Sequence, residues 1–203
     1  MKITSIKQQV KDLERVSIFV DSKYSFSLSL SELVSEKLKN NQELDELDLK
    51  RLKKISEDGK LRARCLNWLL MRPHSEREFR DYLKRKKAEP ELIDSFVAEF
   101  TQRKYLDDKA FAVWFSENRA RKNKSNRAIT SELFSKGISR EIITEIAQEE
   151  EKGEAERLRG LVDKKRKSPR YKNDPEKLAR YLVAQGFSWS LVKEQLLATR
   201  PED

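Results

Sequence analysis

The chain has 203 residues, of which 39% are charged and 37% are apolar, and its net charge is +9. A single cysteine, Cys65, excludes a disulfide framework and a thiolate metal cluster, and its helical spacing from Leu61 and Leu69 predicts a buried thiol. No apolar run reaches the ~20 residues of a membrane span and no signal peptide opens the chain, so we expect a soluble, cytoplasmic protein. Residues 1–60 contain 12 basic and 11 acidic side chains, and the other 143 contain 32 and 24. The positive surplus beyond residue 60 favours a partner rich in phosphate or carboxylate.

Residues 1–28 have the pattern of a small antiparallel sheet. A β-branched and aromatic run at 16–20 is followed by Asp21-Ser22-Lys23 and then by alternating apolar residues, which indicates a hairpin. Ser29 or Ser31 is expected to cap a short helix. A longer helix begins after Leu44, and Gly59 is expected to break or bend it. We assign residues 1–60 to this N-terminal β-hairpin or sheet with its helices.

Beyond residue 60 the sequence repeats with spacings of 50 and 49 residues. Three segments begin with a helix N-cap residue, at Ser75, Ser125 and Asp174, and place apolar side chains four and eight residues later. A second apolar pair follows each segment, at Leu92/Ile93, Ile142/Ile143 and Leu191/Val192. Such a repeat is typical of stacked helical units, which present a long surface to another macromolecule.

The repeats are predicted at 63–108, 109–152 and 154–199, each with three helices. The expected helices are 61–71, 75–87, 89–103, 109–120, 125–136, 139–151, 154–166, 174–185 and 188–198. Ser75 and Glu78 are expected to form a capping box, and Gly137 and Gly186 to end the middle helices as C′ residues. Lys87 stands in the equivalent place of the first repeat. The fold class is therefore mainly α, with three tandem three-helix repeats in an elongated curved array and a small N-terminal antiparallel sheet.

Catalytic and cofactor-binding signals are weak. The only histidine, His74, neighbours Ser75, but adjacent residues seldom point at each other and no glycine-rich elbow accompanies them. Asp107-Asp108 is open to interpretation as a metal site, although an aspartate capping the next helix is favoured. No phosphate-cradling glycine loop is present. We expect no enzyme activity, no metal and no cofactor.

Basic residues cluster near the same point of successive repeats. One such run alone is typical of a solvated surface, whereas the recurrence favours a stripe along a phosphate backbone or an acidic groove. Aromatic residues are not interleaved with the runs, apart from Tyr171, which argues against sequence-specific reading of single strands. Trp68 and Trp114 are expected in the core, and Trp189 is expected to be partly exposed. The candidate contact residues are Arg72, Arg77, Arg80, Lys84, Lys87, Arg119, Arg121, Lys122, Lys124, Arg127, Lys164, Lys165, Arg166, Lys167, Arg170 and Lys172.

Three motifs in this order resemble the RecX regulators of the RecA recombinase. They are Arg72-x-x-Ser75-x-x-Glu78-Phe79-x-x-x-Leu83, Tyr105-Leu106-Asp107-Asp108-x-x-Phe111-Ala112 and Glu132-Leu133-x-x-Lys136-Gly137-Ile138. The resemblance covers the repeats, and the N-terminal strands look like an extension that many members carry. Two departures are Lys87-Ala88, where Lys-Gly is usual, and the loop at 123–126, which often contains glycine.

The resemblance implies a non-enzymatic modulator that binds in the groove of the RecA filament on single-stranded DNA. There it would restrain ATP hydrolysis, strand exchange and the coprotease role of RecA in the SOS response. We expect a monomer that contacts the RecA filament, with single-stranded DNA as a further contact. The alternative is a general nucleic-acid-binding helical repeat module that acts without a recombinase partner.

Overall fold

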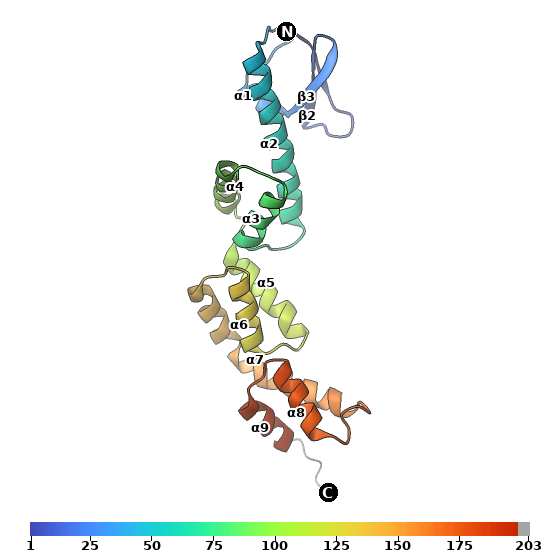
Figure 1. Ribbon diagram of the computed structural model, residues 1–203, viewed down its shortest axis with the longest axis vertical. Helices are drawn as coiled ribbons and strands as arrows, with labels where there is room; N and C mark the ends of the chain where they lie inside the picture. Colours follow the sequence, from blue (N-terminus) through green and yellow to red (C-terminus); the bar gives the residue numbers. More distant parts are fainter. Residues whose placement is uncertain (199–203) are drawn as a thin grey trace. The chain divides into compact units, whose positions relative to one another are not determined.

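A computed structural model describes residues 1–198, apart from the side chains of residues 149–152. The chain divides into two compact units, one from Met1 to Met71 and one that begins at Arg72 (Figure 1). Residue 199, the last of the predicted third repeat, lies outside the described residues. None of the described helices is both long and apolar enough to cross a membrane.

The first unit contains the three-stranded antiparallel sheet that the sequence predicts. Its strands are β1 (Ile3–Gln8), β2 (Arg15–Val20) and β3 (Lys23–Ser29), in that order. Val20 pairs with Lys23, and the two residues between them have positive φ angles, 48° at Asp21 and 68° at Ser22. Both values suit a two-residue type I′ turn, whose twist matches that of the strands. The hairpin and the sheet are confirmed.

Two helices complete the first unit. Helix α1 (Leu30–Ser35) begins at Ser29, which forms a capping box with Glu32. Helix α2 (Glu46–Leu70) runs for 25 residues through Gly59, so the expected break at that glycine is wrong. A Cβ atom at Gly59 would lie 2.1 Å from Oε1 of Glu32. The glycine therefore allows the close approach of α1, at a helix cost of only about 1 kcal/mol.

Apolar residues from the strands and from the segment between α1 and α2 form the core of this unit. Ile18 and Leu28 are fully buried in the sheet, and Leu38, Leu44 and Leu52 join the same cluster. A small sheet needs such a partner, because a few strands alone bury too little apolar surface. Cys65 on α2 is also buried, as the sequence predicts.

The second unit is helical. Its helices are α3 (Glu76–Arg85), α4 (Pro90–Gln102), α5 (Asp108–Arg121), α6 (Asn126–Ser135), α7 (Arg140–Arg166), α8 (Pro175–Ala184) and α9 (Trp189–Ala198). Helix α7 is continuous, so the prediction of separate helices at 139–151 and 154–166 is wrong. The glycine near the predicted boundary, Gly153, costs too little to end a long helix. The mainly helical fold class is confirmed, while the repeat limits at 63, 109 and 154 stay a prediction.

Successive middle helices meet at two equivalent junctions. At the first, Ser75 Oγ donates to the carbonyl oxygen of Lys136 at 2.9 Å, and Asp108 accepts from the backbone N–H of Glu76 at 2.8 Å. At the second, the N–H of Ser125 lies 3.5 Å from the carbonyl oxygen of Gln185, and Glu154 accepts from the N–H of Asn126 at 2.7 Å. In both, the unpaired groups at one helix N-terminus find partners on the following repeat.

The junctions also explain where the C′ glycines occur. Gly137 and Gly186 have φ angles of 83° and 96°, as predicted for the ends of α6 and α8. A Cβ atom at Gly137 would lie 2.9 Å from Cβ of Arg77, and one at Gly186 would lie 2.4 Å from Oγ of Ser125. Lys87 adopts the same left-handed conformation, with φ of 59°, but it is exposed. A side chain is therefore tolerated there at the cost of backbone strain alone.

Candidate functional site

Glu78 on helix α3 is the centre of a charge network in the second unit. Its carboxylate accepts hydrogen bonds from Arg72 Nη1 at 3.0 Å and from Lys136 Nζ at 2.8 Å. His74 Nδ1 lies 3.2 Å from the same carboxylate. Lys136 follows α6, so the network ties the beginning of α3 to the end of a helix from the next repeat.

The network lowers the pKa of Glu78. Burial opposes ionisation of the carboxyl group, but hydrogen bonds from His74, Lys136 and Arg72 outweigh it and lower the pKa from 4.5 to about 2. A carboxyl group with a depressed pKa stabilises the fold above its unfolded pKa and loses that contribution as the pH falls.

We therefore expect an acid-sensitive contribution to stability from Glu78. It should amount to roughly 1–2 kcal/mol after solvent screening, and it should be lost as the pH falls from 4.5 toward 2. Urea unfolding of the wild-type chain and of Glu78→Gln at several pH values in this range measures it. Equal pH dependence in the two proteins would contradict this assignment.

A basic pocket of about 360 Å³ opens beside Glu78, between α3, α5 and α6. Four cationic side chains and one carboxylate line it. The Arg72 guanidinium lies 5.1 Å from the centre of the Trp114 ring, and that of Arg119 lies 4.7 Å from the Phe115 ring. These aromatic faces orient both guanidinium groups. The other two cations that line the pocket are Lys122 and Lys136.

The basic pocket suits an anion. Glu78 is the one carboxylate among the described lining residues, and it is shared between Arg72, Lys136 and His74. It therefore neutralises only part of the positive charge of the four cations. Arg72, Arg119 and Lys136 already pair with carboxylates, so Lys122 is the cation of the described lining that is available to a phosphate or a carboxylate, and charge-assisted hydrogen bonds to such groups are the strong ones. The arrangement is suited to binding an anion.

The structure divides the predicted contact residues into two groups. Members of the first are held by internal partners: Arg80 by Glu76 and Asp94, both at 2.6 Å, and Arg119 by Glu132 at 2.6 Å. The others in this group are Arg72 on Glu78, Arg121 on Glu117, Arg166 on the Leu196 carbonyl, and Lys165 and Arg170 against Tyr171.

The second group has no charged partner among the described residues. We call these side chains the open cations, and they are Arg77, Lys84, Lys87, Lys122, Lys124, Arg127, Lys164, Lys167 and Lys172. All except the half-buried Lys124 are exposed. Of the four candidate cations at 77–87, only Arg77 and Lys84 are open cations on α3 itself. Arg80 is paired, and Lys87 lies beyond the end of the helix.

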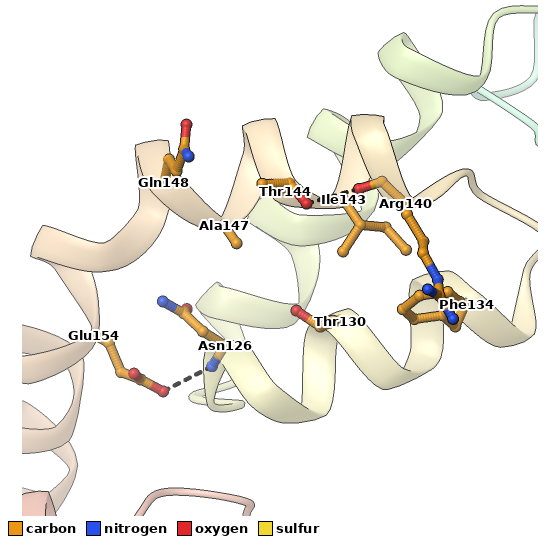
Figure 2. A pocket seen from close by; sticks show the side chains of 9 residues that line it. All are labelled: Asn126, Thr130, Phe134, Arg140, Ile143, Thr144, Ala147, Gln148 and Glu154. Atoms are coloured by element: carbon orange, nitrogen blue, oxygen red, sulfur yellow. Dashed lines mark hydrogen bonds between the residues drawn. The ribbon is translucent and has the colours of Figure 1, made fainter.

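A second hollow, of about 520 Å³, lies between α6 and α7 (Figure 2). Thr130, Ile143 and Ala147 line its middle, and the two charged side chains among its described lining residues are already engaged. Arg140 lies over the Phe134 ring at 5.9 Å, and Glu154 accepts from the N–H of Asn126. The hollow thus presents mainly neutral groups and is a weaker candidate for an anionic partner than the basic pocket.

Several residues have roles that differ from the sequence-based expectation. His74 lies in the loop between α2 and α3, but its side chain is only 3% exposed and contacts Glu78. Ser75 caps α3 as predicted, but the Glu78 carboxylate turns to Arg72 and Lys136, so no capping box forms. Asp107 caps α5, which confirms the capping interpretation. No group of three metal-ligating side chains occurs in the part of the chain that the structure describes.

The network around Glu78 was not predicted from composition or charge runs. The signal for it was present in the motifs, since Arg72, Glu78 and Lys136 all occur in the sequences that carry the family resemblance. Their contact joins residues 58 positions apart, which no local pattern reveals. Burial of Trp68 and Trp114 is only partial, whereas Trp189 is 61% exposed, as expected.

Three family models match the chain. They describe the regulatory protein RecX N-terminal domain at residues 1–45, the first RecX three-helix domain at 62–100 and the second at 107–145. The latter two matches fall on the segments that contribute the charge network and the basic pocket.

Related proteins carry the same description. A "Regulatory protein RecX" from Listeria innocua is 35% identical over 150 residues, which cover 73% of this chain and 56% of that protein. One from Listeria monocytogenes is 32% identical over 199 residues, covering 95% of this chain and 74% of that protein. A crystal structure of regulatory protein RecX, 26% identical, superposes with a TM-score of 0.73 over 95% of this chain and 97% of that one. The chain thus spans little more than half the length of the first relative.

Proposed function

The chain belongs to the RecX family of regulatory proteins, and we propose that it regulates a RecA recombinase, mainly as an inhibitor. In this proposal it binds as a monomer in the groove of the RecA filament on single-stranded DNA, in the cytoplasm. It restrains ATP hydrolysis, strand exchange and coprotease activity by occupying that groove. It acts by binding and carries out no chemical step.

The open cations are the observation that carries this proposal. A side chain already paired inside the protein gains little from a new anion, whereas an exposed and unpaired one is available for phosphate or carboxylate. The open cations occur on α3 and just after it, on the loop between α5 and α6 and the first turn of α6, and from the end of α7 to the segment before α8. This distribution suits a partner that is long and repetitive, such as a filament. Each contact is modest, so affinity would come from their number and would fall steeply with salt.

The direct test is the single-stranded-DNA-dependent ATPase of RecA with the full chain added below the RecA concentration. We expect inhibition at low salt that weakens as salt rises, because phosphate contacts release counterions. An unchanged ATPase at every salt concentration, with a folded protein, would overturn the proposed function.

Reversing open cations should weaken the effect on RecA. For Arg77→Glu with Lys84→Glu, we expect the concentration for half-maximal ATPase inhibition to rise on the order of tenfold at low salt. The matched control is Lys50→Glu with Lys53→Glu, which reverses two exposed charges on α2 outside the candidate set. If both double variants inhibit equally, the contact surface is placed wrongly even if the function is right.

The alternative is a nucleic-acid-binding module without a recombinase partner. The strongly basic second unit supports this alternative equally well, since phosphate alone would satisfy the open cations. Salt-dependent binding to DNA together with an unaffected RecA ATPase would favour it.

A further inference from the structure

A pocket of about 520 Å³ lies in the last part of the second unit, against helix α9. We call it the α9 pocket, and its main lining residues are Tyr171, Lys172, Pro175, Trp189, Lys193 and Leu197. Its size falls in the range of ~300–1,000 Å³ that is typical of sites for small ligand groups.

Helix α9 has two apolar faces, and one of them is open. Val192 and Gln195 are buried and belong to the core face. Trp189, Lys193 and Leu197 are spaced by four residues and share the other face. The Trp189 side chain is 61% exposed and that of Leu197 is 53% exposed. A large indole ring left in solvent beside a pocket indicates a surface that binds something.

The charged residues that line the pocket, among those that the structure describes, are all basic. Lys172 and Lys193 are exposed and have no charged partner among the described residues. Arg166 also lines the pocket, where it donates to the Leu196 carbonyl oxygen at 2.9 Å. None of the described residues that line the pocket is acidic. The nearby Asp174 is occupied, because it accepts from the N–H of Lys177 at 2.8 Å.

We propose that the α9 pocket binds one nucleotide of single-stranded nucleic acid. A base stacks on the exposed ring of Trp189, and the flanking phosphates contact Lys172 and Lys193. Stacking suits any base, because every base has a π-face, and it requires a strand whose bases are unpaired. A free aromatic face beside two cations is the combination found in sequence-tolerant single-strand sites.

An acidic peptide is the competing occupant, and it fits less well. Lysine side chains would attract its carboxylates, but an indole ring exposed at the rim offers most to a flat partner that covers it. Tyr171 is buried, and the centre of its ring lies 5.4 Å from the centre of the Tyr181 ring. The aromatic side of the pocket is therefore held in place. A rigid wall with one free ring favours a planar base over a flexible side chain.

The proposal does not depend on the recombinase, so it is tested with the full chain and a fluorescein-labelled oligothymidylate alone. Trp189→Ala should weaken binding, measured by fluorescence anisotropy at low salt, by about tenfold. Trp189→Phe keeps an aromatic face and should retain most of the affinity. The matched control is Phe134→Ala, which removes another exposed aromatic ring and should leave binding unchanged.

Two further readouts distinguish stacking from nonspecific attraction. Oligothymidylate should quench the intrinsic tryptophan fluorescence of the wild-type chain, and Trp189→Phe should abolish that quenching. Lys172→Ala with Lys193→Ala should reduce the slope of log affinity against log salt by ~0.7 for each lost phosphate contact, whereas Lys177→Ala should not change it.

Equal binding by Trp189→Ala and Phe134→Ala would overturn the proposal. A second result would also overturn it. If oligothymidylate does not change the tryptophan fluorescence, and polyglutamate at equal concentration displaces it, the pocket accepts an acidic segment. The wild-type chain could instead self-associate with rising concentration and bind no DNA, and Trp189→Ala could lose that self-association. This result would identify the surface as a contact between copies of the chain and would also overturn the proposal. None of these outcomes alters the RecA ATPase test.

Discussion

Replacing Glu78 by glutamine should lower the free energy of unfolding by about 2–3 kcal/mol at neutral pH. The side chain is 16% exposed and it balances Arg72, Lys136 and the contact with His74. Glutamine keeps the shape but loses the charge, so two cations lose their anionic partner in a partly buried place. In a chain of this length the loss corresponds to a decrease of roughly 5–10 °C in the melting temperature. Chemical denaturation followed by circular dichroism measures it.

Glu117→Gln is the control for the loss of a carboxylate. Glu117 forms an exposed pair with Arg121 at 3.7 Å, four residues away on the same helix. Exposed pairs of this kind contribute about 0.5 kcal/mol or less. If both substitutions have the same small effect, the Glu78 network does not stabilise the fold and the pKa of Glu78 is not lowered by it.

The elements that the sequence predicts best are those with local causes. The Asp21–Ser22 turn, the Asp107 cap and the C′ position of Gly137 each depend on a few neighbouring residues. A cap needs one side-chain acceptor near the first free N–H groups, and a C′ glycine needs one left-handed residue. Such rules apply wherever the residues occur, which is why these predictions are confirmed.

Long helices were harder to predict, because glycine is a weak signal inside a helix. Gly59 and Gly153 both lie within continuous helices, although the sequence analysis placed a break or a boundary near each. A penalty of about 1 kcal/mol is easily offset by packing along the rest of a long helix. Sequence alone does not show that packing.

The basic clusters show the same limit for the candidate site. Arg80 and Lys84 look alike in the sequence, yet Arg80 is held by Glu76 and Asp94 while Lys84 is open. Whether a cation is available depends on carboxylates brought near by the fold. Lys193 was missed for a related reason, since it stands outside any basic run and gains interest only from its place beside Trp189.

Motif residues and contact residues therefore separate into two sets. Arg72, Glu78 and Lys136 hold the first junction together, and Gly137 allows its close approach. The open cations lie on or beside the helices that these junctions position. A substitution in the first set is expected to act through stability, and one in the second through affinity, so the two can be told apart by measuring both quantities.

Gly186→Ala should destabilise the second unit by about 2–5 kcal/mol. The φ angle of 96° costs a residue with a side chain about 1–2 kcal/mol, and overpacking adds roughly 1–3 kcal/mol. The new methyl group would lie 2.4 Å from Oγ of Ser125 and 3.1 Å from Cβ of Ala128, which are packed residues at the start of α6. Urea unfolding followed by circular dichroism measures the loss.

Two control substitutions separate the strain from the loss of glycine itself. Gly160→Ala lies in α7 with nothing within 4 Å of the added Cβ atom, so it should stabilise the chain by about 0.5–1 kcal/mol. Lys87→Gly removes left-handed strain at an exposed position and should also stabilise, by up to about 1 kcal/mol. A stability loss in Gly186→Ala no larger than the gain in Lys87→Gly would mean that backbone strain alone requires glycine there. A clearly larger loss would show that the packing of one repeat against the next requires it, because Gly186 lies against the start of α6, whereas Lys87 is exposed.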